Sequence, residues 1–222
     1  MGTSGFRMPD SLRLCGRVLR LSVPAEVGAG LDFINLGLDD EYGLQDLPFQ
    51  PRTILDIGAN FGLFSLFAAH HCKNAKIHAY EPNPRIFPDA AKNLALISAT
   101  AFQAGVGSRS GLAEIHERGE SRLAQTVVSQ QGTIQIIAVR TAIDRIGSVV
   151  DLLKLDCEGA EWDIFQDTQA FQKVRLIRME YHLTDGHRLE DLKVWAEQLG
   201  FRIDRLAPNV GFGIAWLSRI DR

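Results

Sequence analysis

The stretch that decides the fold is Thr53-Ile54-Leu55-Asp56-Ile57-Gly58-Ala59-Asn60-Phe61-Gly62. It begins with a short apolar run that predicts a buried strand over Thr53–Ile57, and an apolar helix is expected over Gly62–Cys72. A carboxylate at a strand end, followed by small residues at a helix start, lets a ligand approach the backbone closely. Asp56 would repel a phosphate, so this turn favours a ligand group that carries positive charge, such as an α-ammonium.

The same alternation of strand, turn and helix continues outward from this stretch. It predicts strands over Lys76–Tyr80, Ala101–Val106, Val149–Leu155 and Val174–Tyr181, and a helix over Arg85–Ile97. Alternation of this kind is typical of parallel βαβ units, in which helices cover both faces of one sheet. The sequence therefore predicts an α/β fold.

Antiparallel elements are expected at the edges of this fold. Leu112–His116 and Thr133–Val139 are interpreted as an inserted antiparallel pair, and the loop around Glu117–Gly132 is expected to close over a substrate. Phe201–Arg205 and Gly213–Leu217 are interpreted as a terminal hairpin, which suits an α/β sheet with an antiparallel edge.

Residues 1–51 differ in residue pattern from the rest of the chain. Two short strands around Gly16 are expected within Leu12–Leu21, and glycines and the acidic stretch Asp39-Asp40-Glu41 follow them. We therefore divide the chain into an N-terminal cap over residues 1–51 and a main domain over residues 52–222. Met1–Gly5 does not lead into the apolar core of a secretory signal.

The composition excludes several classes of protein. Of the 222 residues, 45% are hydrophobic and 23% are charged, and the net charge of −3 gives no general attraction to nucleic acid or anionic membranes. The apolar runs are too short to span a bilayer. The three cysteines, Cys15, Cys72 and Cys157, lack the spacing of a zinc site. We expect a cytoplasmic protein with a small-molecule partner and no nucleic-acid or membrane partner, and a homo-oligomer stays open.

A second acid, Glu81, ends the next predicted strand, 25 residues after Asp56. A carboxylate there can accept hydrogen bonds from both hydroxyls of a ribose, as it does in dinucleotide-binding folds. The three-glycine fingerprint of those folds is missing, because only Gly58 and Gly62 are present. The alternative interpretation is a turn glycine, a helix cap and a solvated acid. Together with Ala79-Tyr80-Glu81-Pro82-Asn83, however, the turn resembles the S-adenosyl-L-methionine (SAM) site of Rossmann-like methyltransferases.

A third acidic feature follows the strand predicted over Val149–Leu155. Asp156, Glu158 and Glu161 lie at its end, where open parallel sheets bind ligands. Lys154 lies within the apolar strand on the same side as Asp156, and a buried lysine needs a partner, either Glu180 or Asp156. Helix capping would explain one or two of the acids, but it does not explain the embedded lysine.

The motif Lys154-x-Asp156-x-Glu158-Gly159-x-Glu161 is similar to the signature of the FkbM family of SAM-dependent methyltransferases. Other landmarks of that family follow the same order along residues 52–182: Asp56-x-Gly58-Ala59-Asn60-x-Gly62, Glu81-Pro82, the Thr-x-x-Asp segment within Val139–Asp144, and Glu180 within Met179–His182. The resemblance implies a Rossmann-like class I fold with a mostly parallel seven-stranded sheet and an antiparallel edge. It also implies SAM as cofactor and O-methylation of a hydroxyl on a small molecule, either a secondary metabolite or a sugar.

The resemblance also implies roles for individual residues. Those expected to bind the cofactor are Asp56, Gly58, Asn60, Gly62, Glu81, Pro82, Ala104, Gly105, Asp156 and Glu161, with Ala104 and Gly105 beside the adenine. Those expected at the catalytic centre are His182, Asp156, Glu158, Glu180 and Lys154. His182 is our first choice of general base, because an ordinary imidazole titrates near neutral pH. Asp156 or Glu158 is the second choice, provided that burial raises its pKa.

Two alternatives stay open at this point. Asp156, Glu158, Glu180 and His182 could converge on Mg²⁺ or another divalent cation, but the spacing does not require this and we assign no metal ligand. The chain could also be a module that binds SAM or another nucleoside without catalysis. The complete set of acids in the motifs favours the enzyme.

Overall fold

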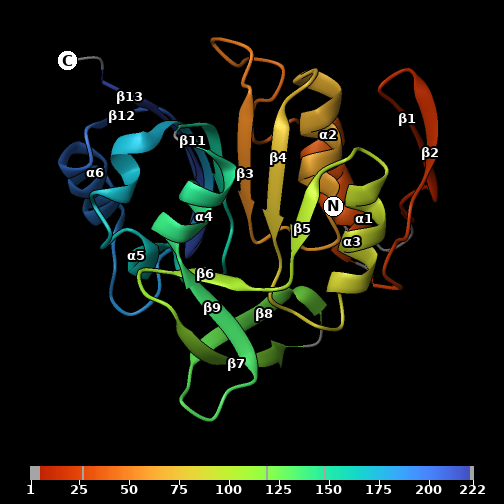
Figure 1. Cartoon of the computed structure of the whole chain (residues 1–222). Coiled ribbons are helices and arrows are strands. Elements are labelled where there is room, and N and C mark those ends of the chain that lie inside the picture. Colours follow the sequence, from red (N-terminus) through yellow and green to blue (C-terminus); the bar gives the residue numbers. More distant parts are fainter. Residues whose placement is uncertain (1–5, 27, 119, 148, 221–222) are drawn as a thin grey trace.

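The computed structural model describes residues 6–26, 28–118, 120–147 and 149–220, so the expectation for Met1–Gly5 lies outside the described residues. Its centre is a seven-stranded sheet (Figure 1). In order across the sheet, the strands are β12 (Phe201–Pro208), β13 (Phe212–Arg219), β11 (Val174–His182), β10 (Val150–Leu155), β3 (Thr53–Ile57), β4 (Lys76–Tyr80) and β5 (Thr100–Phe102). Neighbours from β11 to β5 pair in parallel, whereas β13 is antiparallel to both β11 and β12. The predicted α/β fold with an antiparallel edge is confirmed.

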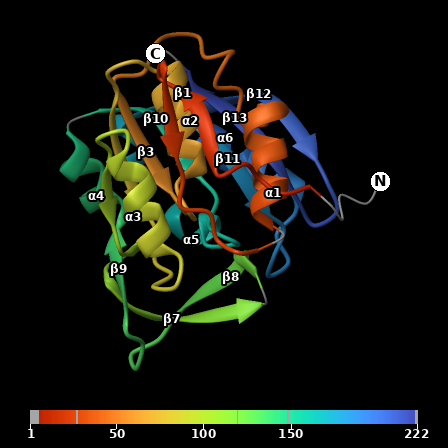
Figure 2. The same ribbon diagram turned by 90° about the vertical axis from the view of Figure 1, so that its right-hand side faces the viewer.

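Helices cover both faces of this sheet (Figure 1, Figure 2). On one face lie α2 (Leu63–His71) and α3 (Phe87–Ala95), and on the other lie α4 (Val139–Ile146), α5 (Glu161–Ile164) and α6 (Leu189–Gln198). The chain runs from β3 outward to β5 and then returns to β10 on the other side of β3. Such a reversal of strand order opens a crevice at the carboxyl ends of the strands, where ligands bind in open α/β sheets.

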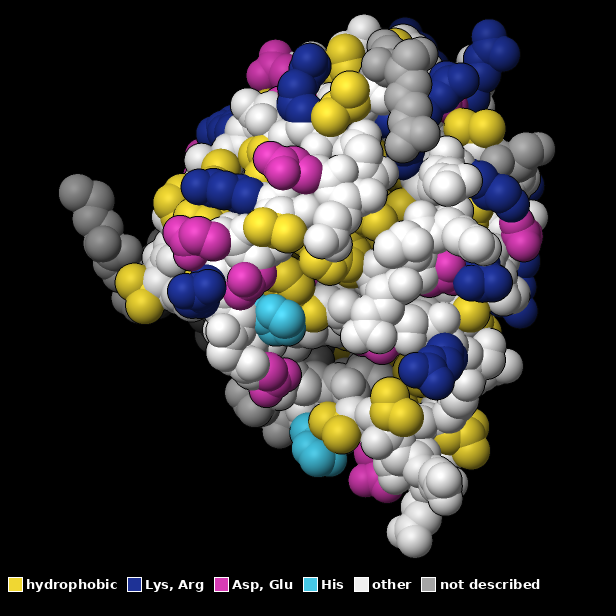
Figure 3. All heavy atoms as spheres, turned by 90° about the vertical axis from the view of Figure 1, so that its left-hand side faces the viewer, with side chains coloured by type: hydrophobic (Ala, Val, Ile, Leu, Met, Phe, Trp, Pro, Cys, Tyr) yellow, Lys and Arg dark blue, Asp and Glu magenta, His cyan; other side chains and the backbone are white. Residues whose placement is uncertain are grey.

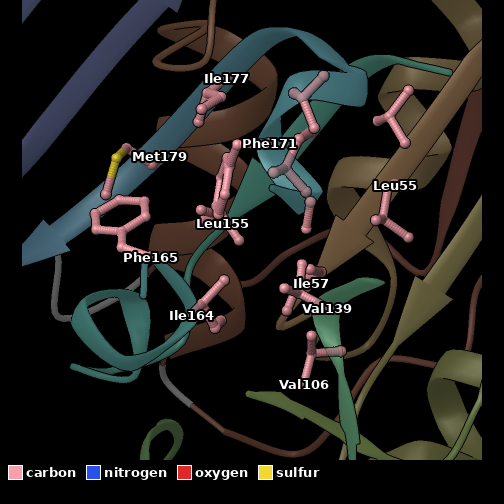
Figure 4. Close-up of a cluster of buried hydrophobic side chains, with 14 of the residues drawn as sticks. Leu55, Ile57, Val106, Val139, Leu155, Ile164, Phe165, Phe171, Ile177 and Met179 are labelled. Atoms are coloured by element: carbon pink, nitrogen blue, oxygen red, sulfur yellow. The ribbon is translucent and has the colours of Figure 1, made fainter. Parts of the chain in front are cut away.

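The larger hydrophobic core lies between the sheet and the layer formed by α4, α5 and α6. Figure 4 shows side chains of β3, β10 and β11 meeting those of the helical layer, and the labelled residues are all buried. Phe171, in the short 3₁₀ helix η2 (Ala170–Lys173), packs edge-on against Phe165 with ring centroids 5.7 Å apart. It also meets Trp195 of α6 at 6.2 Å, so one ring joins three elements.

A second, four-stranded sheet corrects two expectations. Its order is β6 (Gly105–Gly107), β9 (Ile134–Ala138), β7 (Gly111–Arg118) and β8 (Glu120–Val128). The antiparallel pair β7–β9 was expected, but the predicted loop over Glu117–Gly132 is wrong, because most of it is strand β8. The β-branched run Thr126-Val127-Val128 favours this strand.

The single strand expected over Ala101–Val106 is also wrong. The chain leaves the main sheet after Phe102, turns through the hydrogen bond from Ala104 N to Phe102 O, and joins the second sheet at Gly105. A Cβ at Gly105 would lie 2.4 Å from Ile136 Cδ1, so the strand passes close to β9 and a larger residue would have to displace the end of that isoleucine side chain. The crossing places Gly105 next to the carboxyl ends of the main sheet.

The N-terminal residues pack on the α2 face. The hairpin of β1 (Ser11–Leu14) and β2 (Arg17–Arg20) turns at Gly16 as expected. It is followed by α1 (Gly28–Phe33) and a π-helical turn, η1 (Ile34–Leu38). Leucines of the hairpin join the core of α2, but the division of the chain at residue 52 stays a prediction.

Two surface properties bear on partners. Within the part of the chain that the structure describes, no helix combines the length and apolar character needed to cross a membrane. On the face shown in Figure 3, acidic and basic side chains are interspersed and hydrophobic side chains are scattered among them. This face therefore carries no broad field of one sign.

We predict that Phe171→Ala lowers the free energy of unfolding by about 3–5 kcal/mol, because it leaves a cavity between three packed elements. Urea denaturation followed by circular dichroism measures the change. The control is Val210→Ala, at a side chain that is 91% exposed, which we expect to change the free energy by less than about 0.5 kcal/mol. Equal effects of the two substitutions would contradict this description of the core.

Candidate active site

A buried lysine connects the ends of the two central strands. Lys154 on β10 lies in register with Asp56 on β3, and its Nζ is 3.5 Å from Asp56 Oδ1 and 3.4 Å from Asp156 Oδ2. The same nitrogen donates a hydrogen bond of 2.6 Å to the carbonyl oxygen of Gly58. Burial lowers the pKa of Lys154, but the charges of Asp156 and Asp56 outweigh burial and raise it. Asp156 is therefore a partner of this lysine, as expected.

The turn after β3 needs glycine at its first position. The backbone N–H groups of Gly58 and Ala59 both donate to the carbonyl oxygen of Tyr80, each at 3.0 Å. Gly58 has φ of +79°, and a Cβ there would lie 1.7 Å from the carbonyl oxygen of Asp156. The end of β10 is thus seated directly against this turn, and Gly62, with φ of +87°, begins α2 on its other side.

Asp56 itself is fully enclosed beneath the turn. Its Oδ2 accepts a hydrogen bond of 2.6 Å from Ser65 Oγ on α2, and burial raises its pKa although Lys154 opposes this. Its Oδ1 has no hydrogen-bond partner among the described residues. Direct binding of an α-ammonium by Asp56 stays a prediction; in the structure, its carboxylate orients Lys154.

Glu81 closes the same turn from β4. Its Oε2 accepts the N–H of Asn60 at 2.7 Å, and its Oε1 accepts the N–H of Asn83 at 2.8 Å. Burial raises the pKa of Glu81 to about 7, against the opposing effect of these two hydrogen bonds. Asn60 Nδ2 in turn donates to Asp32 Oδ2 of the N-terminal segment at 3.3 Å.

The residues expected beside an adenine lie close to Glu81. Pro82 Cβ is 3.6 Å from the position that a Cβ on Gly105 would take, and Ala104 is buried beside it in sequence. A surface hollow of about 390 Å³ adjoins this place. It is lined by Asn83, Pro84, Arg85, Glu114, Ile115, Thr133 and Ile134. The structure thus brings the predicted cofactor residues of β3, β4 and β6 to one edge of the sheet.

The acidic turn after β10 surrounds His182. Its Nδ1 is 3.4 Å from Glu161 Oε1, and its Nε2 is 3.3 Å from Glu180 Oε1 and 3.6 Å from Glu158 Oε2. Burial lowers the pKa of His182, but Glu161 and Glu180 outweigh burial and raise it to about 11. An imidazole that carries protons on both nitrogens has no free lone pair. The role of His182 as general base stays a prediction; in the structure, its ring lies among three carboxylates.

The acids of this turn have different environments. Glu161 is fully buried, and its carboxylate accepts the N–H groups of Cys157 at 2.8 Å and Gly159 at 3.0 Å, so it holds the turn together. Glu158 is partly exposed and has φ of +53°, an uncommon conformation for a residue with a side chain. Burial, followed by the charge of Asp156, raises the pKa of Glu158 to about 8.

Metal ligation was left open for Asp156, Glu158, Glu180 and His182. Across the described ranges of the chain, no three His, Cys, Asp or Glu side chains are arranged to hold a metal ion. The carboxylates of this group lie against the cations of Lys154 and His182 instead.

Three site residues were missed by sequence reasoning, and all belong to the N-terminal segment. Tyr42 is buried and donates a hydrogen bond of 3.2 Å to Asp156 Oδ2 across 114 positions of sequence. Burial, followed by the charges of Glu180 and Asp156, raises the pKa of the neighbouring Glu41 to about 8. Asp32 is the third, through its contact with Asn60. The acidic stretch that ends at Glu41 was the available signal, but nothing in it indicates a contact with Asp156.

Sequence comparisons match this chain to methyltransferases. Residues 56–203 match the model of the methyltransferase FkbM domain. The chain is 30% identical over 211 residues to methyltransferase sdnD of Sordaria araneosa, which covers 75% of this chain and 80% of that protein.

Solved structures show the same fold at low sequence identity. Protein PH1948 of Pyrococcus horikoshii superposes with a TM-score of 0.53 at 13% identity, covering 90% of this chain and 94% of that chain. TrmK of M. capricolum, in complex with S-adenosyl-homocysteine, superposes with a TM-score of 0.50 at 12% identity, covering 81% of this chain and 67% of that chain. These likenesses establish the Rossmann-like class I methyltransferase fold.

We predict that Gly58→Ala lowers the free energy of unfolding by about 2–5 kcal/mol. The left-handed backbone costs about 1–2 kcal/mol for alanine, and overpacking against Asp156 adds about 1–3 kcal/mol. Thermal and urea unfolding measure the change.

Gly16→Ala is the matched control, because Gly16 has φ of +76° but has nothing within 4 Å of its Cβ position. It should show the backbone cost alone, about 1–2 kcal/mol. If both variants lost the same stability, the close approach of Asp156 to the turn would be contradicted.

Proposed function

Since the chain belongs to the FkbM family of SAM-dependent methyltransferases, we propose that it transfers the methyl group of SAM to a hydroxyl oxygen of a small molecule, either a secondary metabolite or a sugar. The observation that carries this proposal is a pair of carboxylates at the ends of the two strands that flank β3. Glu81 follows β4 and Asp156 follows β10, so the two acids lie on either side of the turn at Gly58. They lie at the point where the strand order reverses. That point is where an open α/β sheet holds its ligand.

The residues present fit a nucleoside with a cationic tail. Glu81 is a buried carboxylate whose backbone hydrogen bonds fix its direction, and carboxylate oxygens retain lone pairs for ribose hydroxyls. The turn at Gly58 lacks a Cβ, which lets the end of β10 and its acid Asp156 lie directly against the turn and beside the place of the ligand. Pro82, Ala104 and Gly105 would lie along the base. The acids of the site outnumber the cations Lys154 and His182, which suits a sulfonium.

The chemistry is an in-line displacement, and SAM supplies an electrophilic methyl group bound to a sulfonium sulfur. The acceptor oxygen forms the new O–CH₃ bond as the S–CH₃ bond breaks, and the proton of the hydroxyl passes to a base. The chain's own contribution is to position the acceptor and to take this proton. We assign the base to Glu158, since its pKa of about 8 lies near neutral pH and His182 is held as a cation beside it.

The N-terminal segment is proposed as a cap over the acceptor side. Tyr42 and Asp32 contact Asp156 and Asn60 respectively, so residues before the β3 strand complete the wall of the site.

The three cysteines form no disulfide, which supports the proposal of a reducing cytoplasmic compartment.

We predict that SAM affinity rises with pH up to about pH 7 and that Glu81→Gln removes this dependence. Burial raises the pKa of Glu81 to about 7, whereas hydrogen bonds from ribose hydroxyls favour its ionised form. Binding therefore releases a proton below pH 7, and affinity should fall there by about tenfold per pH unit. Titration calorimetry of the wild type and the variant from pH 5.5 to about 8.5 isolates the contribution of Glu81.

At pH 8, the Glu81→Gln variant should bind SAM about 10- to 150-fold more weakly than the wild type, because it loses charge-assisted hydrogen bonds. Glu190→Gln, at an exposed acid of α6, is the control and should behave like the wild type. An unchanged affinity of Glu81→Gln would remove Glu81 from the ribose site.

We predict that the protein forms methyl ethers from a hydroxylated acceptor. Incubation with SAM carrying a ¹³C-methyl group, together with a panel of sugars and polyketide alcohols, should give a product whose carbon resonance is that of an O-methyl group. Glu158→Gln should lower kcat by about 10²- to 10⁴-fold and leave SAM affinity unchanged. A methyl group on nitrogen or carbon would refute O-methylation, and an unchanged kcat would exclude Glu158 as the base.

A further inference from the structure

We propose that Tyr42 is a positioning residue for Asp156, and that the pair orients the acceptor hydroxyl toward the methyl group. This inference rests on the proposed function. It extends the site to a segment before residues 56–203, the part of the chain that matches the family model. Tyr42 would act through Asp156 without touching SAM.

The two buried donors hold a single oxygen of Asp156. Tyr42 OH lies 3.2 Å and Lys154 Nζ lies 3.4 Å from Oδ2 of this carboxylate. The side chain of Lys154 is 4% exposed, whereas that of Asp156 is 30% exposed. The carboxylate is therefore fixed from its buried side, and Oδ1 is left to meet a hydroxyl from the open side. A carboxylate held at one oxygen can accept a hydrogen bond at the other without rotating.

The local chain around Tyr42 is built to fix this tyrosine. The carboxylate of Asp40 accepts the N–H groups of Leu44 at 2.8 Å and Gln45 at 3.0 Å, which closes a turn around Tyr42. Gly43 has φ of +62°, and a Cβ there would lie 2.3 Å from the ring of Trp216. Glycine permits the left-handed backbone at this point, and the hydrogen bonds to Asp40 hold the turn in place.

Two distant contacts seat this turn on the main domain. Trp216 Nε1, on β13, donates a hydrogen bond of 2.8 Å to the carbonyl oxygen of Glu41. The ring of Tyr42 packs edge-on against Phe64 of α2, with centroids 5.4 Å apart and planes at 81°. The turn and the ring of Tyr42 are thus both anchored, and the hydroxyl lies within hydrogen-bonding distance of Asp156. A tyrosine needed only to fill the core would require neither the hydroxyl nor this anchoring.

Removal of the hydroxyl should therefore affect catalysis more than binding of the cofactor. In Tyr42→Phe, Asp156 keeps Lys154 as its partner but can rotate about its side-chain bonds. A misplaced acceptor loses the alignment that an in-line transfer needs, which costs about 10²-fold for a displacement of 1 Å. The contacts of Glu81 with Asn60 and Asn83 do not involve Tyr42, so SAM affinity should change less than kcat.

The test compares Tyr42→Phe with Tyr181→Phe in the full chain. Tyr181 is equally buried, but its hydroxyl has no hydrogen-bond partner within the described part of the chain, so its loss controls for the removal of one buried oxygen. We expect Tyr42→Phe to lower kcat by about 10- to 100-fold, with a smaller change in SAM affinity by calorimetry. Tyr181→Phe should keep the kcat of the wild type.

A second measurement needs no acceptor and does not depend on a stable Tyr42→Phe variant. The chain has three tyrosines, so incorporation of 3-fluorotyrosine gives three fluorine resonances, which the two phenylalanine variants assign. If Tyr42→Phe did not fold, the spectra of Tyr181→Phe and Tyr80→Phe would identify the other two resonances. The third resonance would then belong to Tyr42. Addition of S-adenosyl-homocysteine should shift the Tyr42 resonance through Asp156 and leave the Tyr181 resonance in place.

The outcomes separate this inference from the proposed function. If the wild type bound neither SAM nor S-adenosyl-homocysteine, the proposed function would fail and this inference with it. If the wild type bound SAM and formed a methyl ether while Tyr42→Phe kept full kcat, the function would stand and the inference would be overturned. A Tyr42 resonance that ignored the bound product would overturn it as well.

Discussion

The need to neutralise one buried cation organises the whole site. Lys154 lies between apolar neighbours on β10, where an unpaired ammonium would be unstable. Its partners come from three places: Asp56 from the preceding parallel strand, Asp156 from the following turn, and the Gly58 carbonyl from the turn between β3 and α2. These groups can surround one nitrogen only if β3 and β10 are adjacent and in register. The geometry of the site therefore depends on this pairing of the two central strands.

The raised pKa values of the other acids arise because several carboxylates lie buried close together around Lys154. Burial raises the pKa of Glu81 to about 7 and the pKa values of Glu41 and Glu158 to about 8. Each of these groups is thus poised to change its charge near neutral pH when a ligand arrives. A donor with a sulfonium and an ammonium would favour the ionised forms, whereas an anionic acceptor would meet repulsion. His182 compensates part of this excess, which explains why it is shared among three carboxylates.

The parts of this structure that sequence predicts well are those encoded by local patterns. The strands Thr53–Ile57 and Lys76–Tyr80 end where expected, because short, mostly apolar runs between polar turns are typical of buried strands. The break after Phe102 and strand β8 were not predicted, since both depend on a second sheet whose partners are remote. The motifs located Lys154 and Asp156, but the hydrogen bond from Tyr42 joins positions with no shared pattern. His182 shows the same limit: its identity suggested a base, and its neighbours determine its charge.

The contact between Trp216 and Glu41 has a consequence for how the protein matures. The indole of Trp216 on β13, the last strand along the described residues, donates a hydrogen bond to the carbonyl oxygen of Glu41, 175 positions earlier. During translation, this contact with the residue next to Tyr42 cannot form until β13 has left the ribosome. Such remote contacts form slowly and late in folding. A polypeptide interrupted before β13 would lack the hydrogen bond that anchors the turn around Tyr42.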